Sequence, residues 1–111
     1  MVHNIYSFIG LAVKAGKLIS GEEACERAIK QKNISLIIIA EDASLNTKKK
    51  FTDKCKYRDV DMRFFGTKEM IGRYIGKEIR SVIAISDAGF AKKLIEKIDG
   101  CSNEIGGEHI G

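Results

Sequence analysis

The residues of this 111-residue chain that are best suited to chemistry are the basic side chains between residues 44 and 58. This stretch holds six lysines or arginines against Asp53 alone, a local charge of +5, whereas the whole chain carries +4. A dense positive surface on a small domain attracts anionic partners, and nucleic acid is the commonest of them. A lysine-rich helix that only keeps a protein in solution has the same composition, so charge alone leaves both interpretations open.

Two glycine-bearing loops add a second kind of anion chemistry. The first covers residues 16–21 and leads into a predicted helix that begins near Glu22, and the second covers residues 76–80. The N-terminus of a helix presents free amides and the positive end of its dipole to phosphates, and glycine lets a nucleic-acid backbone approach closely. The two loops are therefore suited to gripping a single RNA feature together.

Residues for catalysis or for metal binding are sparse in this sequence. The three cysteines are far apart and the two histidines lie near the ends, which is neither a zinc-ligand spacing nor a disulfide framework. We expect Cys25 and Cys55 to be reduced, small apolar residues. The pair Glu41-Asp42 resembles a carboxylate site, but the simpler interpretation is that Asp42 closes the turn before Ser44. We therefore expect a protein that is not an enzyme and that needs no cofactor and no metal.

Helical and strand periodicities alternate along the chain and must position these groups. Apolar residues spaced by three and four predict helices over about 3–15, 21–32, 45–57, 67–74 and 88–99. Short apolar or alternating runs predict strands over 17–19, 34–40, 60–64 and 80–86. This alternation predicts an α/β protein with a three-layer α/β/α sandwich around a small sheet of four strands.

Polar residues mark the predicted helix starts. The segment Ser20-Gly21-Glu22-Glu23 matches a capping box, in which the first and last side chains each bind the other's backbone amide. Single caps are expected at the later helices, from Ser44, Thr67 and Asp87. In the basic helix, the residues that we expect to face the core are Leu45, Phe51 and Cys55.

The length suits one domain, which we place at residues 1–100 and follow with a flexible tail over residues 101–111. No apolar stretch approaches the roughly 20 residues that a spanning helix needs. The first residues also lack the pattern of a secretory signal. We therefore expect a cytoplasmic protein with no membrane partner.

Motifs throughout the folded part of the chain carry a resemblance to a known family. They are Gly10-Leu11-Ala12, Ala15–Glu23, Ala40–Ser44, Asn46–Lys50, Thr52–Cys55, Ile75–Glu78 and Ala84–Asp87 with Phe90-Ala91. Over about residues 5–98 the sequence resembles the kink-turn RNA-binding ribosomal proteins (L7Ae-like), specifically their bacterial YlxQ-like branch. The resemblance implies a mixed four-stranded sheet and binding to structured RNA, commonly ribosomal, through the start of the second helix and the loop before the last strand.

The helix start departs from the family's pattern at two positions. The best-known family members carry Gly-x-Asn-Glu-x-x-Lys, and the corresponding residues here are Gly21, Glu23, Ala24 and Arg27. An asparagine both donates and accepts hydrogen bonds, whereas an ionised glutamate only accepts, and alanine offers no polar contact to a base. Glu23 therefore serves either the capping box alone or a direct contact with RNA.

The leading hypothesis is non-catalytic binding of structured RNA that is ribosomal or ribosome-associated and kink-turn-like. Its phosphate contacts are expected from Lys14, Lys17, Arg27, Lys48, Lys49 and Arg80. The other expected site residues are Gly21, Glu22 and Glu23 at the helix start, Gly76 in the second loop, and Ile79, which would pack on an unstacked base. The alternative is a protein-interaction module that docks an acidic partner without RNA.

Overall fold

Helices and strands alternate along the chain, as the periodicity predicts. The computed structural model describes the backbone of residues 2–110 and the side chains of residues 2–101. In order, its elements are α1 (Val2–Lys14), β1 (Leu18–Ser20), α2 (Glu22–Gln31), β2 (Leu36–Ile39), α3 (Leu45–Arg58), β3 (Asp61–Phe64), α4 (Lys68–Tyr74), β4 (Val82–Ile85) and α5 (Ala88–Ile110). The four predicted strands are confirmed, each with small shifts at its ends.

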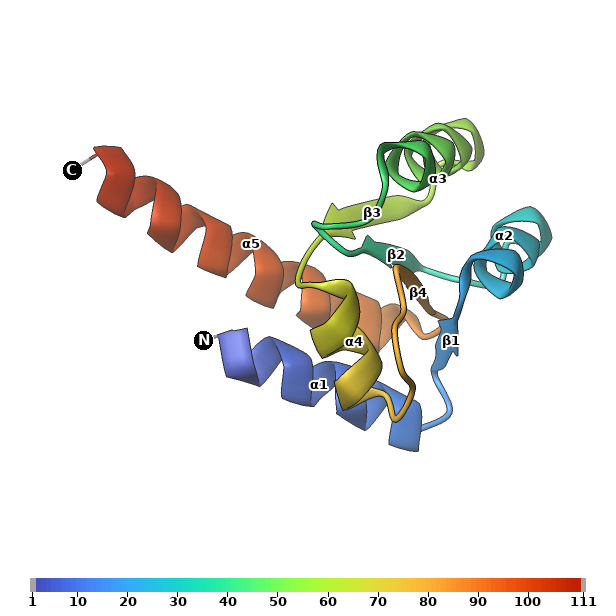
Figure 1. Cartoon of the computed structure of the whole chain (residues 1–111), viewed down its shortest axis with the longest axis horizontal. Helices are drawn as coiled ribbons and strands as arrows, with labels where there is room; N and C mark the ends of the chain where they lie inside the picture. Colours follow the sequence, from blue (N-terminus) through green and yellow to red (C-terminus); the bar gives the residue numbers. More distant parts are fainter. Residues whose placement is uncertain (1, 111) are drawn as a thin grey trace.

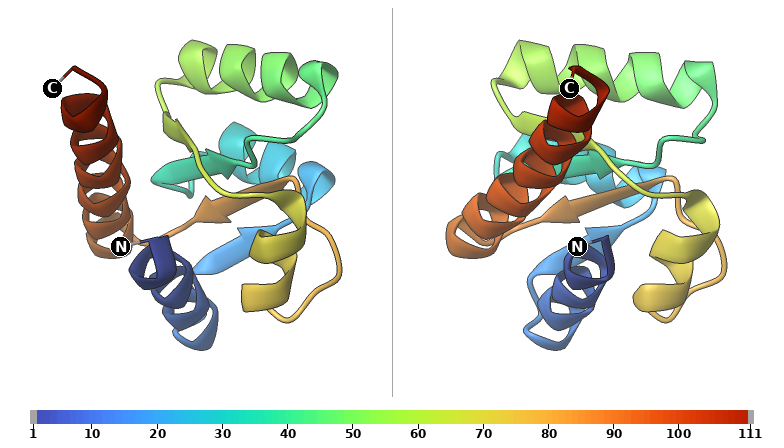
Figure 2. Two further views of the ribbon diagram at one scale, coloured as in Figure 1. Left: turned by 60° about the vertical axis from the view of Figure 1, so that its left-hand side comes forward. Right: turned by 90° about the vertical axis from the view of Figure 1, so that its left-hand side faces the viewer.

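The strands form one mixed sheet in the order β1-β4-β2-β3. β2 and β3 are parallel, and β4 runs antiparallel to both of its neighbours. The helices α2 and α3 cover one face of this sheet, and α1, α4 and α5 lie on the other side (Figures 1 and 2). The predicted three-layer α/β/α sandwich around a four-stranded sheet is therefore confirmed.

The two central strands form the middle of the hydrophobic core. Every residue of β2, with sequence LIII, and of β4, with sequence VIAI, is fully buried. Strands that are covered by helices on both faces need apolar side chains on both faces, which explains their uninterrupted hydrophobicity. The edge strand β3, with sequence DMRF, contains two charged residues. None of its four residues is fully buried, because helices cover this edge of the sheet only partly.

The last helix is longer than the sequence predicts. We expected it to end at Gly100, but α5 continues to Ile110. A glycine costs a helix about 1 kcal/mol relative to alanine and stops it only when another conformation is better satisfied. The positive backbone angles that end helices occur instead at other glycines, such as Gly16. The mobility of residues 101–111 stays a prediction. None of the helices in the described residues combines the length and apolarity needed to cross a membrane.

Two cysteines face the interior between α2, α3 and the sheet, as predicted. Cys25 and Cys55 are both buried and unbridged. Burial, with smaller contributions from the negative charges of Cys55 and Glu22, raises the pKa of Cys25 to about 12. Burial also raises the pKa of Cys55 to about 11. Both thiols are therefore protonated at neutral pH and serve as small apolar groups rather than nucleophiles.

Candidate nucleic-acid interface

Three segments that are distant in sequence meet where β4 begins. Because β4 is antiparallel to both neighbours, its first residue lies beside the last residues of β1 and β2. The amide of Gly21 donates to the carbonyl of Val82 at 3.0 Å, and the amide of Ala40 donates to the carbonyl of Ser81 at 2.8 Å. The start of α2 (residues 21–23), the start of α3 (residues 44–48) and the loop of residues 76–81 therefore share one side of the molecule, which we call the convergent edge.

The start of α2 differs from the predicted capping box. The N-cap residue is Gly21, with φ 99° and ψ 150°, and no side chain accepts a hydrogen bond there. Ser20 is instead the last residue of β1, where it pairs with Ile83 of β4. The predicted capping box between Ser20 and Glu23 is wrong because the backbone of Ser20 belongs to β1, so the helix begins one residue later than a Ser20 cap requires. Glu23 is thus released from a capping role.

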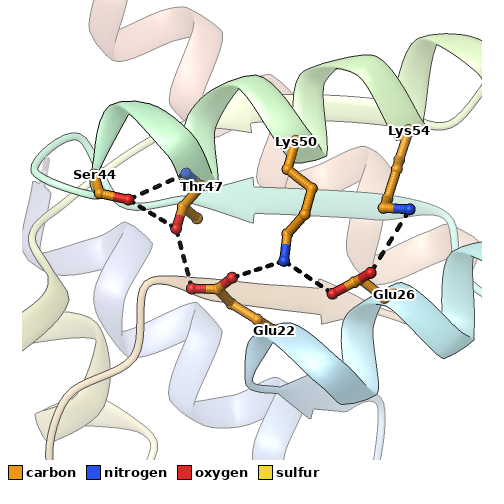
Figure 3. Close-up of polar contacts among 6 residues, drawn as sticks. All are labelled: Glu22, Glu26, Ser44, Thr47, Lys50 and Lys54. Atoms are coloured by element: carbon orange, nitrogen blue, oxygen red, sulfur yellow. Dashed lines mark hydrogen bonds and ion pairs between the residues drawn. The ribbon is translucent and has the colours of Figure 1, made fainter.

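A ladder of polar contacts joins the first turns of α2 and α3 (Figure 3). The hydroxyl of Ser44 accepts from the Thr47 amide at 3.1 Å, which confirms the predicted cap, and donates to the Thr47 hydroxyl oxygen at 3.0 Å. The Thr47 hydroxyl in turn donates to Glu22 at 3.1 Å. The side chain of Glu22 is therefore directed to α3, so Glu22 fixes the relative position of the two helix starts.

Two lysines of α3 continue this ladder along the helices. Lys50 lies 3.2 Å from Glu22 and 3.0 Å from Glu26, and Lys54 lies 3.6 Å from Glu26. These cations are paired with acidic residues of α2 and are not available to a phosphate without breaking those pairs. We refer to Ser44, Thr47, Glu22, Lys50, Glu26 and Lys54 together as the interhelix ladder.

The basic stretch is therefore less positive at the surface than its sequence indicates. Besides the two lysines in the ladder, Lys49 lies 3.4 Å from Asp53. The ammonium of Lys48 sits 5.9 Å from the centroid of the Phe64 ring, and among the described side chains it makes no ion pair. Of the two lysines predicted to contact RNA in α3, Lys48 is unpaired and Lys49 is partly satisfied by an exposed, weak pair.

The contribution of Glu26 to the stability of the folded protein is expected to depend on pH. The pKa of Glu26 is lowered from 4.5, first by the hydrogen bond from Lys50 and further by the charges of Lys50 and Lys54. Such a carboxylate stabilises the folded state above its unfolded pKa, and this contribution is lost as the pH falls through the lower folded pKa. We therefore expect Glu26→Gln to lower the urea midpoint at neutral pH, and the difference from the parent protein to shrink steadily below pH 4.5.

Glu96→Gln is the matched control for this measurement. Glu96 lies on α5, and in the described part of the chain its carboxylate makes no ion pair. Its substitution should leave the urea midpoint unchanged at every pH. A deficit for Glu26→Gln that is the same in acid and at neutral pH would show that lost packing, and not the ion pairs, is responsible.

Backbone hydrogen bonds hold the loop of residues 76–81 against α4. Lys77 donates to the Gly72 carbonyl at 2.8 Å, and Arg80 donates to the Lys68 carbonyl at 3.1 Å. The side chain of Ile79 is 57% exposed, so a fixed backbone presents an apolar group to solvent. The Arg80 guanidinium donates to the carbonyl of Ile79 at 2.7 Å. The loop thus displays an apolar side chain next to a cation.

The acidic pair after β2 has a structural role that differs from the expected one. Asp42 lies in the predicted turn before Ser44, which the Ala43 amide closes by donating to the Ala40 carbonyl at 3.1 Å. Its carboxylate, however, accepts from outside that turn, from the Lys68 amide at 2.8 Å, at the first residue of α4. The amide of Glu41 donates to the carbonyl of Gly66 at 2.8 Å. Both residues therefore tie the end of β2 to the start of α4.

The convergent edge gathers some of the predicted site residues and leaves others apart. It contains Gly21, Glu22, Glu23, Lys48, Gly76, Ile79 and Arg80, with Arg27 one turn further along α2. Lys17 directly precedes β1 and so lies at the opposite end of that strand, and Lys14 is the last residue of α1. The carbonyl of Lys17 accepts from Ser86 there, and its ammonium is 4.0 Å from Asp87.

The exposure of one residue at this edge, Leu45, was not predicted from the sequence. Leu45 was expected in the core, but it is the first residue of α3 and is 83% exposed. At about 100° per residue it lies about 240° around the helix from the buried Phe51, so it is off the core face. Thr47, four residues before Phe51, is buried in its place. Counting about 100° per residue from Phe51 would have shown from the sequence that Leu45 lies off the buried face of the helix.

Comparisons with known proteins agree with this architecture. Residues 3–95 match the profile of the ribosomal protein L7Ae/L30e/S12e/Gadd45 family. The RNA-binding protein YlxQ of Bacillus subtilis (strain 168) is 44% identical over 94 residues, which cover 85% of this chain and 94% of that protein. A solved structure of a protein with unknown function from Bacillus halodurans has a TM-score of 0.83 at 41% identity, covering 86% of this chain and 96% of that one. The Giardia lamblia 15.5kD RNA binding protein shares the fold, with a TM-score of 0.74 at 18% identity, over 86% of this chain and 84% of that one.

Proposed function

The chain belongs to the ribosomal protein L7Ae/L30e/S12e/Gadd45 family, and we propose that it binds structured RNA at the convergent edge without catalysing a reaction. The observation that carries this proposal is the meeting of two helix starts with the loop that bears Ile79 and Arg80. Helix N-termini stabilise phosphates through free amides and the dipole. The relative YlxQ of Bacillus subtilis is an RNA-binding protein, which supports the same conclusion.

The charges at this edge suit a folded RNA. Arg27, Lys48 and Arg80 make no ion pair with any described side chain, so they can pair with phosphates at little cost. Exposed Leu45 and Ile79 offer apolar surface to a base that has left its stack. A sharply bent internal loop brings phosphates and unstacked bases close together, which is why we propose a kink-turn-like RNA, ribosomal or ribosome-associated.

The position of Glu23 refines the proposal. Its side chain makes no cap hydrogen bond; it is exposed and lines a shallow hollow together with Glu26, Arg27 and Lys30. An ionised carboxylate accepts hydrogen bonds and cannot donate them. We propose that Glu23 accepts from an exposed amino group of a base, in place of the asparagine of other family members.

A salt titration with a kinked RNA stem tests the binding mode. Each phosphate contact contributes about −0.7 to −0.9 to the slope of log affinity against log salt, so four to six contacts give about −3 to −5. Arg27→Gln and Arg80→Gln should each weaken binding and each make the slope shallower by one contact's share, about 0.7 to 0.9. Fluorescence anisotropy at several salt concentrations measures both quantities.

Lys92→Gln is the control, because Lys92 lies on α5, on the far side of the sheet from α2. It should leave the slope unchanged. A flat salt response of the parent protein would rule out the proposed contacts. Protein purified without nuclease that carries no RNA and binds none at low salt would instead favour an acidic protein partner. Equal binding of kinked and straight duplexes by the parent protein and by Glu23→Gln would reject the kink-specific reading and the role of Glu23.

A further inference from the structure

A groove between α2 and α3 lies at the ends of these helices that are remote from the convergent edge. Contacts of the interhelix ladder show that the helices run side by side in the same direction, since Glu22 meets Thr47 and Glu26 meets Lys54 (Figure 3). The groove has a volume of about 270 Å³ and is lined by Glu26, Ile29, Lys30, Asp53, Lys54, Tyr57 and Arg58. It lies outside the convergent edge, although Glu26 and Lys30 also line the hollow that contains Glu23.

One aromatic residue, Tyr57, lines this groove. It is 84% exposed, whereas Tyr6 is buried and stacks on Tyr74 with ring centroids 5.0 Å apart. The guanidinium carbon of Arg58 lies 5.5 Å from the centroid of the Tyr57 ring. The ring contributes little to the core, and exposing it to water is unfavourable, so a stacking partner for it would be stabilising.

The charges around the ring favour an anionic group. Asp53 and Glu26 are paired with Lys49 and with the ladder lysines, respectively. Lys30 and Arg58, in contrast, make no ion pair within the described residues and stand in the last turns of their helices. The C-terminal dipoles of two helices together amount to about one negative charge, which these two cations outweigh.

We propose that this groove binds one unpaired nucleotide of the RNA, with its base stacked on Tyr57 and its phosphate held by Lys30 and Arg58. The inference rests on the proposed RNA-binding function and adds a second contact to it. A volume of 270 Å³ is slightly below the roughly 300–1,000 Å³ of pockets for whole small molecules, and it suits a single ring system. A ten-residue helix such as α2 is about 15 Å long, so a strand that leaves the convergent edge reaches the groove within a few nucleotides.

The test compares two RNA probes in anisotropy titrations. One is a blunt kinked stem, and the other carries single-stranded adenosine extensions of about six nucleotides at both ends, within the span of known single-strand sites. The parent protein should bind the extended probe more tightly. Tyr57→Ala should lower the affinity for the extended probe about 5- to 150-fold, the range of one stacked base, and leave the affinity for the blunt probe unchanged.

Two further variants separate stacking from charge. Tyr57→Phe keeps the ring and should bind the extended probe like the parent protein. Lys30→Gln should make the salt slope for the extended probe shallower, while Lys92→Gln on α5 should not. Because Tyr57 is so exposed, Tyr57→Ala should unfold at the same temperature as the parent protein.

Three other outcomes of these titrations would reject, respectively, the groove as a nucleotide site, the proposed function, and stacking as the mode of contact. Equal affinity of the parent protein for both probes, or an equal loss for both in Tyr57→Ala, rejects the groove as a nucleotide site while the convergent edge still binds RNA. Failure of the parent protein to bind either probe rejects the proposed function itself. A Tyr57→Phe variant that loses affinity as Tyr57→Ala does would reject stacking as the mode of contact.

Discussion

Gly72→Ala is expected to lower the free energy of unfolding by about 1–3 kcal/mol, because it overpacks a contact between two backbones. A Cβ atom at this position would lie 2.1 Å from the carbonyl oxygen of Glu78 and 3.1 Å from the Cα of Ile79. Neither is the flexible end of a side chain, so the loop of residues 76–81 must move. The gain of up to about 1 kcal/mol from alanine in a helix is too small to offset this cost.

Movement of the loop of residues 76–81 should also weaken RNA binding. The loop carries Ile79 and Arg80, and its end is tied to Ala40 through the Ser81 carbonyl. We expect Gly72→Ala to weaken binding of a kinked RNA even though it removes no polar contact. Urea unfolding gives the first effect and anisotropy the second.

The matched control is Gly100→Ala in α5, where a Cβ would meet no atom within 4 Å. This variant should be as stable as the parent protein, or more stable by up to about 1 kcal/mol. If Gly72→Ala behaves in the same way and binds RNA normally, the close approach of α4 and the loop is not required.

Gly21→Ala is expected to destabilise the protein by about 1–3 kcal/mol through backbone strain alone. With φ 99° and ψ 150°, Gly21 occupies a region that is essentially restricted to glycine. No atom lies within 4 Å of an added Cβ, so a clash cannot explain the loss. The alanine backbone would relax by turning the start of α2, which would disturb the hydrogen bond to Val82 and the position of Glu22.

This variant should therefore also lose RNA affinity, measured as for Gly72→Ala. Glu23→Ala, two residues further along the same helix start, is the control for stability only. Glu23 makes no cap hydrogen bond, so the unfolding midpoint of this variant should stay close to the parent value. A Gly21→Ala protein with unchanged stability would contradict the strained conformation at the start of α2.

Features that depend on neighbours in sequence were predicted well. Ser44, Thr67 and Asp87 each cap a helix by accepting from the amide three residues later, at 3.1, 3.2 and 2.9 Å. Such a bond needs only the local chain to take up its turn, so the residue pattern is sufficient to identify it. The buried strands were equally clear, because continuous burial leaves a continuous apolar run.

Features that depend on a partner distant in sequence were missed or wrong. Ser20 also had the sequence pattern of a helix cap, but its backbone pairs with Ile83 of β4 and is part of the sheet. Asp42 does lie in the predicted turn, but the partner of its carboxylate is the amide of Lys68 and not a group of that turn. In both cases a competing hydrogen bond from another part of the chain decided the outcome.

The sequence by itself determined that this is an α/β protein with a concentration of positive charge in one helix and glycines in two loops. Only the tertiary structure decided which of those charges are free and which loops meet. Lys50 and Lys54 are paired with acidic residues of α2, and the antiparallel entry of β4 brings Gly21 beside Val82. The reason is that side-chain composition is a property of the chain, whereas a charge's partner and a loop's neighbour are set by strand order and helix packing.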